Sequence, residues 1–230
     1  LDAKEKMGLP FSKETDTSKD SFSYKIVRDD QSVKDSSGEI CVPMYTETVV
    51  LEGGDNAIIN AINHQLLAES TNGFPRELYI TSSDIELTMQ NPYFEFKKIT
   101  DVEVKNLTSK YVSVRYYDFA IWGGTTALIE NSRGATYDLQ TGERITLSDI
   151  FDMSGRRLDS YLATLCIDYV RQHPDDLWID AETTLRNYPF SDYEDYGFYI
   201  EDETVYLLFP KYALGAGAMG PVEIPVELPQ

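Results

Sequence analysis

The chain has 230 residues, and its 20 Lys and Arg residues against 39 Asp and Glu residues give a formal net charge of −19. This acidity argues against nucleic acid as a partner, because phosphate binding needs a basic surface, and it favours a cationic protein or a divalent cation. Hydrophobic residues make up 42% of the chain, which excludes a disordered acidic polymer, and no apolar stretch is long enough to span a membrane.

Residues 1–21 are mostly charged and hydroxyl residues without an apolar period, a pattern that predicts a flexible polar tether. The folded part is expected over residues 22–230, as one compact unit or as two intimate modules of about 22–120 and 121–230. The two-module alternative arises because strand, helix and hairpin patterns occur once before and once after Gly123. Both arrangements stay open at this point.

Apolar and polar residues alternate over residues 22–26 and 40–50, which predicts two strands around a turn-rich stretch. Behind Asp55, apolar residues recur at helical spacing, so a helix is expected to about Glu69. Residues 78–90 fit a short helix as well as a strand, and their structure stays open.

Two hairpins are expected in the middle of the chain. The alternating runs 100–104 and 112–116 predict the first of them. The runs 135–139 and 143–147 flank the turn residues 140–142 and predict the second.

The last third of the chain combines helices and strands. Ser148 is expected to cap a short helix, and an apolar stripe predicts a long helix over residues 155–172. Strands are expected at residues 198–200, 205–209 and 222–226. Hairpins interspersed with helices predict an α+β fold, with an antiparallel or mixed sheet built from hairpins and two or three helices packed on one face.

Most catalytic templates lack their residues in this chain. The two histidines, His64 and His173, form no zinc-binding pair, and neither a serine nucleophile elbow nor a Walker loop occurs. Residues 215–220 spell the dinucleotide pattern Gly-x-Gly-x-x-Gly, but Pro221 follows where a helix should begin, so a tight bend is expected. We predict no catalytic, cofactor-binding or metal-binding residue, and a binding role is favoured over an enzymatic one.

Acidic residues concentrate between Asp180 and Thr204, a stretch that contains eight acidic residues and one basic residue, Arg186. The candidate partner-binding residues in this stretch are Asp192, Tyr193, Glu194, Asp195 and Tyr196. We expect the acidic surface of residues 192–203 to face a cationic partner. The other interpretation is a solvated loop followed by a hairpin turn at residues 201–203, because the spacing of a calcium-binding loop is missing.

The chain contains two cysteines, Cys41 and Cys166. A disulfide between them requires the strand that holds the first cysteine to pack against the helix that holds the second. Two free buried thiols are the favoured interpretation, and the disulfide stays open.

Several sequence features occur in the order typical of one bacterial domain family. They are an aromatic strand at residues 116–119, the pair Gly123-Gly124, the segment 135–151 and the closing segment 198–226. This order resembles a domain of unknown function that forms the ectodomain of RsiV-type lysozyme-sensing anti-sigma factors and accompanies some peptidoglycan deacetylases. The chain has Thr125-Thr126 where that family has a histidine after Gly-Gly, so no role of that histidine carries over.

The resemblance implies an exported, noncatalytic binding or sensing module of the bacterial cell envelope. It would be extracytoplasmic, as a lipoprotein or a surface domain attached through a removed or omitted N-terminal leader. The expected partner is a cationic protein such as lysozyme, or a cell-wall component. The alternative is a carboxylate-dependent cell-wall glycan hydrolase, which needs a cleft with two facing carboxylates, one with a raised pKa. No cofactor is expected, and the oligomeric state is left open.

Overall fold

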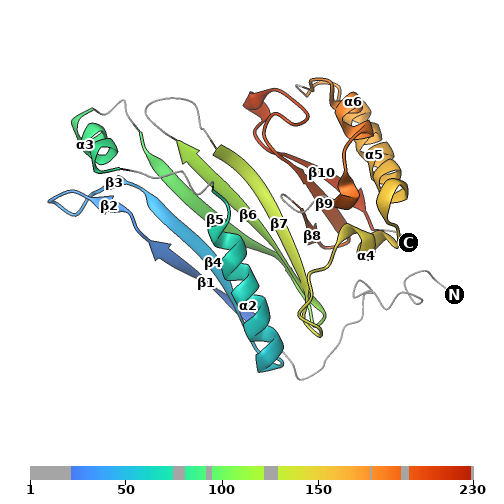
Figure 1. Cartoon of the computed structure of the whole chain (residues 1–230), viewed down its shortest axis with the longest axis horizontal. Coiled ribbons are helices and arrows are strands. Elements are labelled where there is room, and N and C mark those ends of the chain that lie inside the picture. Colours follow the sequence, from blue (N-terminus) through green and yellow to red (C-terminus); the bar gives the residue numbers. More distant parts are fainter. Residues whose placement is uncertain are drawn as a thin grey trace.

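The computed structural model describes residues 22–74, 81–91, 95–121, 129–176, 178–192 and 197–228. These residues form a five-stranded sheet, a three-stranded sheet and a short two-stranded pair. Helices pack on both of the larger sheets (Figure 1). The expected α+β class with a mixed sheet is confirmed, although the helices are shared between two sheets.

The five-stranded sheet has the order β1-β4-β5-β6-β7. Its strands are β1 (Ser23–Asp30), β4 (Met44–Glu52), β5 (Lys97–Leu107), β6 (Tyr111–Ile121) and β7 (Ile129–Asp138). β4 and β5 pair in parallel, and the other neighbours pair antiparallel. Parallel strands need a crossover, which here contains α2 (Asn56–Thr71) and α3 (Ser82–Gln90). The short strands β2 (Val33–Lys34) and β3 (Ile40–Val42) pair with each other.

Helix α2 lies across one face of this sheet (Figure 1). It begins where predicted, because the Asp55 carboxylate accepts hydrogen bonds from the backbone N–H groups of Ala57 and Ile58. Its buried residues Ile59, Ile62 and Leu66 recur at helical spacing and pack against buried residues of β4 to β7. The apolar stripe seen in the sequence therefore forms one side of the first hydrophobic cluster.

The C-terminal part of the chain builds the second sheet, with the order β10-β9-β8. Its strands are β8 (Phe198–Glu201), β9 (Thr204–Phe209) and β10 (Val222–Glu227). The helical elements around it are α4 (Leu147–Phe151), α5 (Gly155–Gln172), α6 (Ala181–Arg186) and the 3-10 turns η1 (Phe190–Asp192) and η2 (Gly217–Met219). Within the described ranges, no helix has the length and apolar character needed to cross a membrane.

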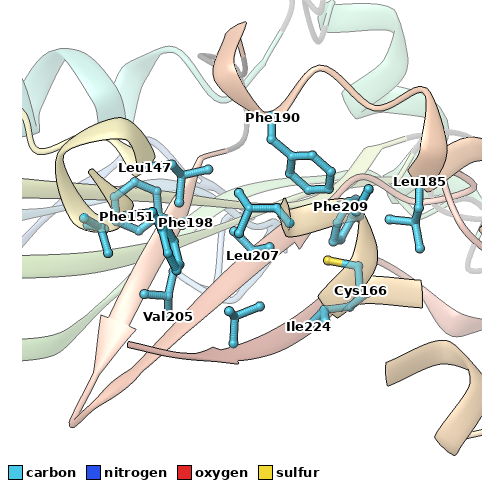
Figure 2. Close-up of a cluster of buried hydrophobic side chains, with 14 of the residues drawn as sticks. Leu147, Phe151, Cys166, Leu185, Phe190, Phe198, Val205, Leu207, Phe209 and Ile224 are labelled. Carbon is cyan, nitrogen blue, oxygen red and sulfur yellow. The ribbon is translucent and has the colours of Figure 1, made fainter. Parts of the chain in front are cut away.

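A second hydrophobic cluster fills the space between α5 and the three-stranded sheet (Figure 2). Cys166 lies there among Phe198, Leu207, Phe209 and Ile224, all less than 9% exposed. The alternation of β8, β9 and β10 directs one face of each strand into this cluster. The described core thus has two clusters, one on each sheet, and whether they belong to one unit or to two modules stays a prediction.

The two sheets meet where β8 crosses the face of β6 and β7 that is turned away from α2. The N–H of Ile200 donates to Ser113 Oγ at 2.7 Å, and Gly134 of β7 lies directly under the backbone of Phe198. A carboxylate of β10 also joins the contact, because Glu223 accepts from the Tyr199 hydroxyl at 2.7 Å and pairs with an arginine of β6. Close backbone approach and polar pairs therefore join the sheets.

The structure differs from the sequence-based expectation in two places and decides one stretch that the sequence left open. The arm 143–147 of the second hairpin is not a strand, and only an isolated bridge between Tyr137 and Arg144 remains. The reason is a capping box, in which Thr146 and Asp149 exchange side-chain to backbone hydrogen bonds and start α4 two residues before the expected Ser148 cap. The open stretch forms α3 over residues 82–90, and α6 was not expected at all.

Candidate functional site

The structure describes part of the acidic stretch proposed from the sequence. Asp192 ends the turn η1, whereas Tyr193, Glu194, Asp195 and Tyr196 lie outside the described residues. Glu201 is the last residue of β8, and Asp202 and Glu203 form the turn to β9, where Asp202 adopts a left-handed backbone with φ of 53°. The intervening strand β8 is mostly buried. The hairpin-turn interpretation is confirmed for residues 201–203, and the acidic surface expected over residues 192–203 stays a prediction.

A different acidic feature lies beside that hairpin, between α5 and the end of β10. It is a pocket of about 490 Å³, here called the tyrosine pocket. Its lining residues are Tyr161, Leu165, Asp168, Tyr169, Gln172, Pro225, Val226, Glu227 and Leu228. Asp168 and Glu227 are the charged residues of this lining, and no Lys or Arg belongs to it.

Regular local structure positions these side chains. Helical spacing places Tyr161, Leu165, Asp168 and Gln172 along one face of α5. On the opposite wall, the N–H of Leu228 donates to the carbonyl oxygen of Glu203 at 3.2 Å, which ties the end of β10 to the acidic hairpin turn. The tyrosine pocket and the acids 201–203 therefore share one end of the C-terminal sheet.

The charges of the tyrosine pocket are only weakly compensated. Arg171 lies 3.9 Å from Asp168, but its guanidinium forms two shorter hydrogen bonds to Glu182, at 2.9 and 2.7 Å. Glu227 makes no ion pair with any described residue. Burial, together with the charge of Asp176, raises the pKa of Tyr169, so its hydroxyl stays protonated at neutral pH.

Two tyrosines beside two carboxylates suit an ammonium or guanidinium group. Aromatic faces attract a cation within about 6 Å of the ring centre, and a carboxylate forms charge-assisted hydrogen bonds with it. Within the part of the chain that the structure describes, no three His, Cys, Asp or Glu side chains gather as metal ligands do. The chemistry of the tyrosine pocket suits a Lys or Arg side chain better than a metal ion.

A second polar pocket, of about 420 Å³, lies between the end of α2 and β7. Beneath it, Arg133 donates two hydrogen bonds to the fully buried carboxylate of Asp118 and one to the carbonyl oxygen of Glu69. The Glu69 carboxylate lies 2.9 Å from Arg144 and accepts from the Tyr137 hydroxyl. Since the carboxylates and guanidiniums already pair with one another, this network is a clamp between helix and sheet.

Sequence reasoning missed both features, although a signal existed for the clamp. Asp118 comes two residues after the buried Tyr116, and Arg133 comes two residues before the buried Ala135. Residues two apart in a strand share one face, so both charges lie on the buried face. A charge on that face needs a buried partner of opposite charge. For the tyrosine pocket the sequence carries no comparable signal, because Asp168 and Glu227 are 59 positions apart and lie in different elements.

The other residues considered from sequence have structural roles. His173 Nδ1 lies 2.8 Å from the Tyr169 carbonyl oxygen, and the two rings stack with centroids 4.0 Å apart. The glycine-rich segment contains the 3-10 turn η2 and ends at Gly220 with φ of 69°. This is the expected bend between two strands.

Both cysteines are free, as expected, but Cys41 is partly exposed and only Cys166 is buried. Burial raises the pKa of the Cys166 thiol to about 12. At pH 8 this thiol is therefore neutral and shielded, and only the thiolate reacts with a disulfide reagent.

We expect one thiol per chain to react with Ellman's reagent at pH 8 under native conditions, and two in guanidinium chloride. The physical reason is the contrast in burial between Cys41 and Cys166. The variant Cys41→Ser is the control, because it should show no reactive thiol until it unfolds. Two fast thiols in the native protein would contradict the buried position of Cys166.

In a comparison with known protein families, one family model matches the C-terminal part of the chain. Residues 148–228 match DUF3298, a protein family of unknown function. This segment runs from α4 to the end of β10 and contains all the lining residues of the tyrosine pocket. No curated protein matches the chain.

Two solved structures share the fold over most of the chain. A DUF3298 family member from Bacteroides fragilis NCTC 9343 aligns with a TM-score of 0.58 and 15% identity, covering 90% of this chain and 91% of that one. A DUF3298 family protein from Pseudomonas aeruginosa PAO1 aligns with a TM-score of 0.50 and 12% identity, covering 91% and 90%. The similarity therefore extends beyond residues 148–228 at the level of the fold, and the link to anti-sigma factors and deacetylases stays a prediction.

Proposed function

We propose that the chain is a noncatalytic, extracytoplasmic binding module of the bacterial cell envelope whose ligand is a cationic protein. The observation that carries this proposal is the tyrosine pocket, with its two carboxylates and no base in the lining. The cell-envelope location rests on the family resemblance, as does lysozyme as the first protein to test.

Binding would combine long-range attraction with local recognition. A net charge of −19 steers a basic protein toward the chain. At contact, a Lys or Arg side chain would lie against Tyr161 or Tyr169 and pair with Asp168 or Glu227. The acids at residues 201–203 would extend this surface at the same end of the sheet.

Among the described carboxyl groups, no pKa shift specifically favours the hydrolase alternative. Four described carboxyl groups, Asp30, Asp35, Glu103 and Glu182, have pKa values shifted from the ordinary range. All four shifts are downward, because hydrogen bonds from Ser32, Ser37, Lys105 and Arg171, respectively, stabilise the charged form. A glycosidase needs the opposite shift in its general acid.

Titration with hen egg-white lysozyme by calorimetry, at about 50 mM and about 200 mM salt, tests the proposal. We expect the double variant Asp168→Asn/Glu227→Gln to bind roughly tenfold more weakly, with a flatter salt dependence, because two charge-assisted contacts are lost. The matched control is Glu143→Gln, which removes one negative charge at the exposed turn after β7 and should bind like wild type.

The outcomes separate the parts of the proposal. No binding at low salt would overturn a lysozyme-like partner. Binding that is unchanged in the double variant would move the contact away from the tyrosine pocket. In that case the triple charge reversal at Asp192, Glu194 and Asp195 tests the surface predicted from the sequence.

A further inference from the structure

Strand β1 is an edge of the five-stranded sheet that no other described segment covers. It pairs with β4 along one side, and the sheet order places it at the end. All eight of its residues are exposed, and three of them are large apolar residues: Tyr24, Ile26 and Val27. A long edge strand with free backbone groups and apolar side chains is a template for another strand.

The pairing with β4 determines which backbone groups are free. The N–H of Gln31 donates to the carbonyl oxygen of Met44, which continues the register of β1 against β4. In an antiparallel ladder, hydrogen-bonded pairs alternate with non-hydrogen-bonded pairs. The odd-numbered residues of β1 therefore bond to β4, and the N–H and C=O groups of Tyr24, Ile26, Arg28 and Asp30 point away from the sheet.

This pattern limits how a second copy of β1 could pair antiparallel with the first. Even-numbered residues must face even-numbered residues across a two-fold axis, so the axis passes through a residue of β1. An axis at Lys25 or Asp29 places two like charges opposite each other and overlaps fewer residues, which leaves Ile26, Val27 and Arg28. If the axis passes through Arg28, the Arg28 side chains of the two copies lie opposite each other and repel. If it passes through Ile26, no residue of β1 lies opposite a residue of opposite charge in the second copy. An axis at Val27 places Lys25 opposite Asp29 of the partner, and the symmetry repeats that ion pair.

The apolar surface agrees with the axis at Val27. Val27, Thr48 and Val50 line a pocket of about 340 Å³ between the edge of the sheet and α2, together with Leu67, which is 52% exposed. Val27, Lys25 and Asp29 share this face of the strand. In the paired copies, two valines would meet between two ion pairs, next to this apolar pocket.

We propose that two copies of the chain associate through β1 in this register and form one continuous sheet across a two-fold axis. The occupant of the edge is a second copy because the charges of β1 complement themselves in the register that the hydrogen bonds allow. Two chains of net charge −19 repel each other over long distances, so the association needs about 150 mM salt to screen that repulsion.

Charge exchange tests the register. Analytical ultracentrifugation of wild type should show a dimer that dissociates on dilution. Lys25→Asp and Asp29→Lys should each weaken the dimer roughly tenfold or more, because like charges then face each other twice. Mixing these two variants should restore a dimer, since each supplies the charges that the other lacks, and the double variant Lys25→Asp/Asp29→Lys should dimerise alone. Circular dichroism spectra control for folding.

Cysteine cross-linking gives a second test that does not depend on charge. Val27→Cys, in a Cys41→Ser background, should form an intermolecular disulfide, because Cα atoms of a non-hydrogen-bonded pair lie about 4.5 Å apart. Ile26→Cys is the matched control, because two residues at position 26 would lie about 8 Å apart, beyond disulfide reach. The proposal would be overturned if the wild-type protein stayed monomeric at a concentration of about 0.5 mM. Equal cross-linking of the two cysteine variants would also overturn it.

Discussion

Replacement of Asp118 by asparagine is expected to lower the free energy of unfolding by about 3 kcal/mol. The Asp118 side chain is fully buried and accepts hydrogen bonds from Arg133 and from the Thr100 hydroxyl. Without its carboxylate, the buried Arg133 guanidinium loses its counter-charge, and an uncompensated buried charge costs much more than an exposed one. Urea unfolding followed by tryptophan fluorescence and circular dichroism measures the change.

The control for this variant is Glu52→Gln, which breaks the exposed ion pair with Lys25. Its expected cost is below about 0.5 kcal/mol, because exposed pairs are solvated and screened. Asp118→Asn and Glu52→Gln make the same change of a carboxylate to an amide, so burial is the variable. Equal losses in the two variants would show that the clamp between α2 and the sheet contributes little to stability.

Gly134→Ala is expected to cost about 3 kcal/mol through a steric clash between the two sheets. A Cβ atom at this position would lie 2.1 Å from the carbonyl oxygen of Phe198 and 2.9 Å from the backbone nitrogen of Tyr199. These are backbone atoms of β8, so no flexible side chain can move aside. The contact must open by the displacement of a whole strand, which urea unfolding would detect.

The matched control is Gly38→Ala, in an open turn. A Cβ atom there meets nothing within 4 Å, but the backbone has φ of +88°, so a cost of about 1 kcal/mol is expected from conformation alone. A smaller loss for Gly134→Ala than for Gly38→Ala would mean that the sheets separate easily. In that case the two hydrophobic clusters should unfold in separate transitions, which is the behaviour of two modules.

The two proposed surfaces are compatible with each other. β1 lies at one edge of the five-stranded sheet, whereas α5 and β10 lie on the other side of the molecule (Figure 1). A dimer through β1 would leave both tyrosine pockets accessible. Two pockets on one assembly would raise the apparent affinity for a partner with repeated cationic sites, because the second contact becomes intramolecular.

Local chemistry explains the elements that sequence reasoning located well. Asp55 and the apolar stripe of α2 are contained within 17 residues, and the apolar stripe of α5 lies within a single helix. The β8–β9 hairpin is likewise a local pattern of alternation around a turn. The strand expected over residues 143–147 is wrong because the alternation there suits a strand, whereas the capping box of Thr146 and Asp149 starts a helix.

The amino-acid sequence by itself determined the α+β class, the net charge of −19 and most helices and strands, because caps, periodicity and charge depend on neighbouring residues. Only the tertiary structure decided which distant residues meet. Asp118 pairs with Arg133 across two strands, and Asp168 shares a pocket with Glu227 from another element. The exposed edge of β1 likewise depends on the strand order, because whether a strand has one neighbour or two is a property of the whole sheet.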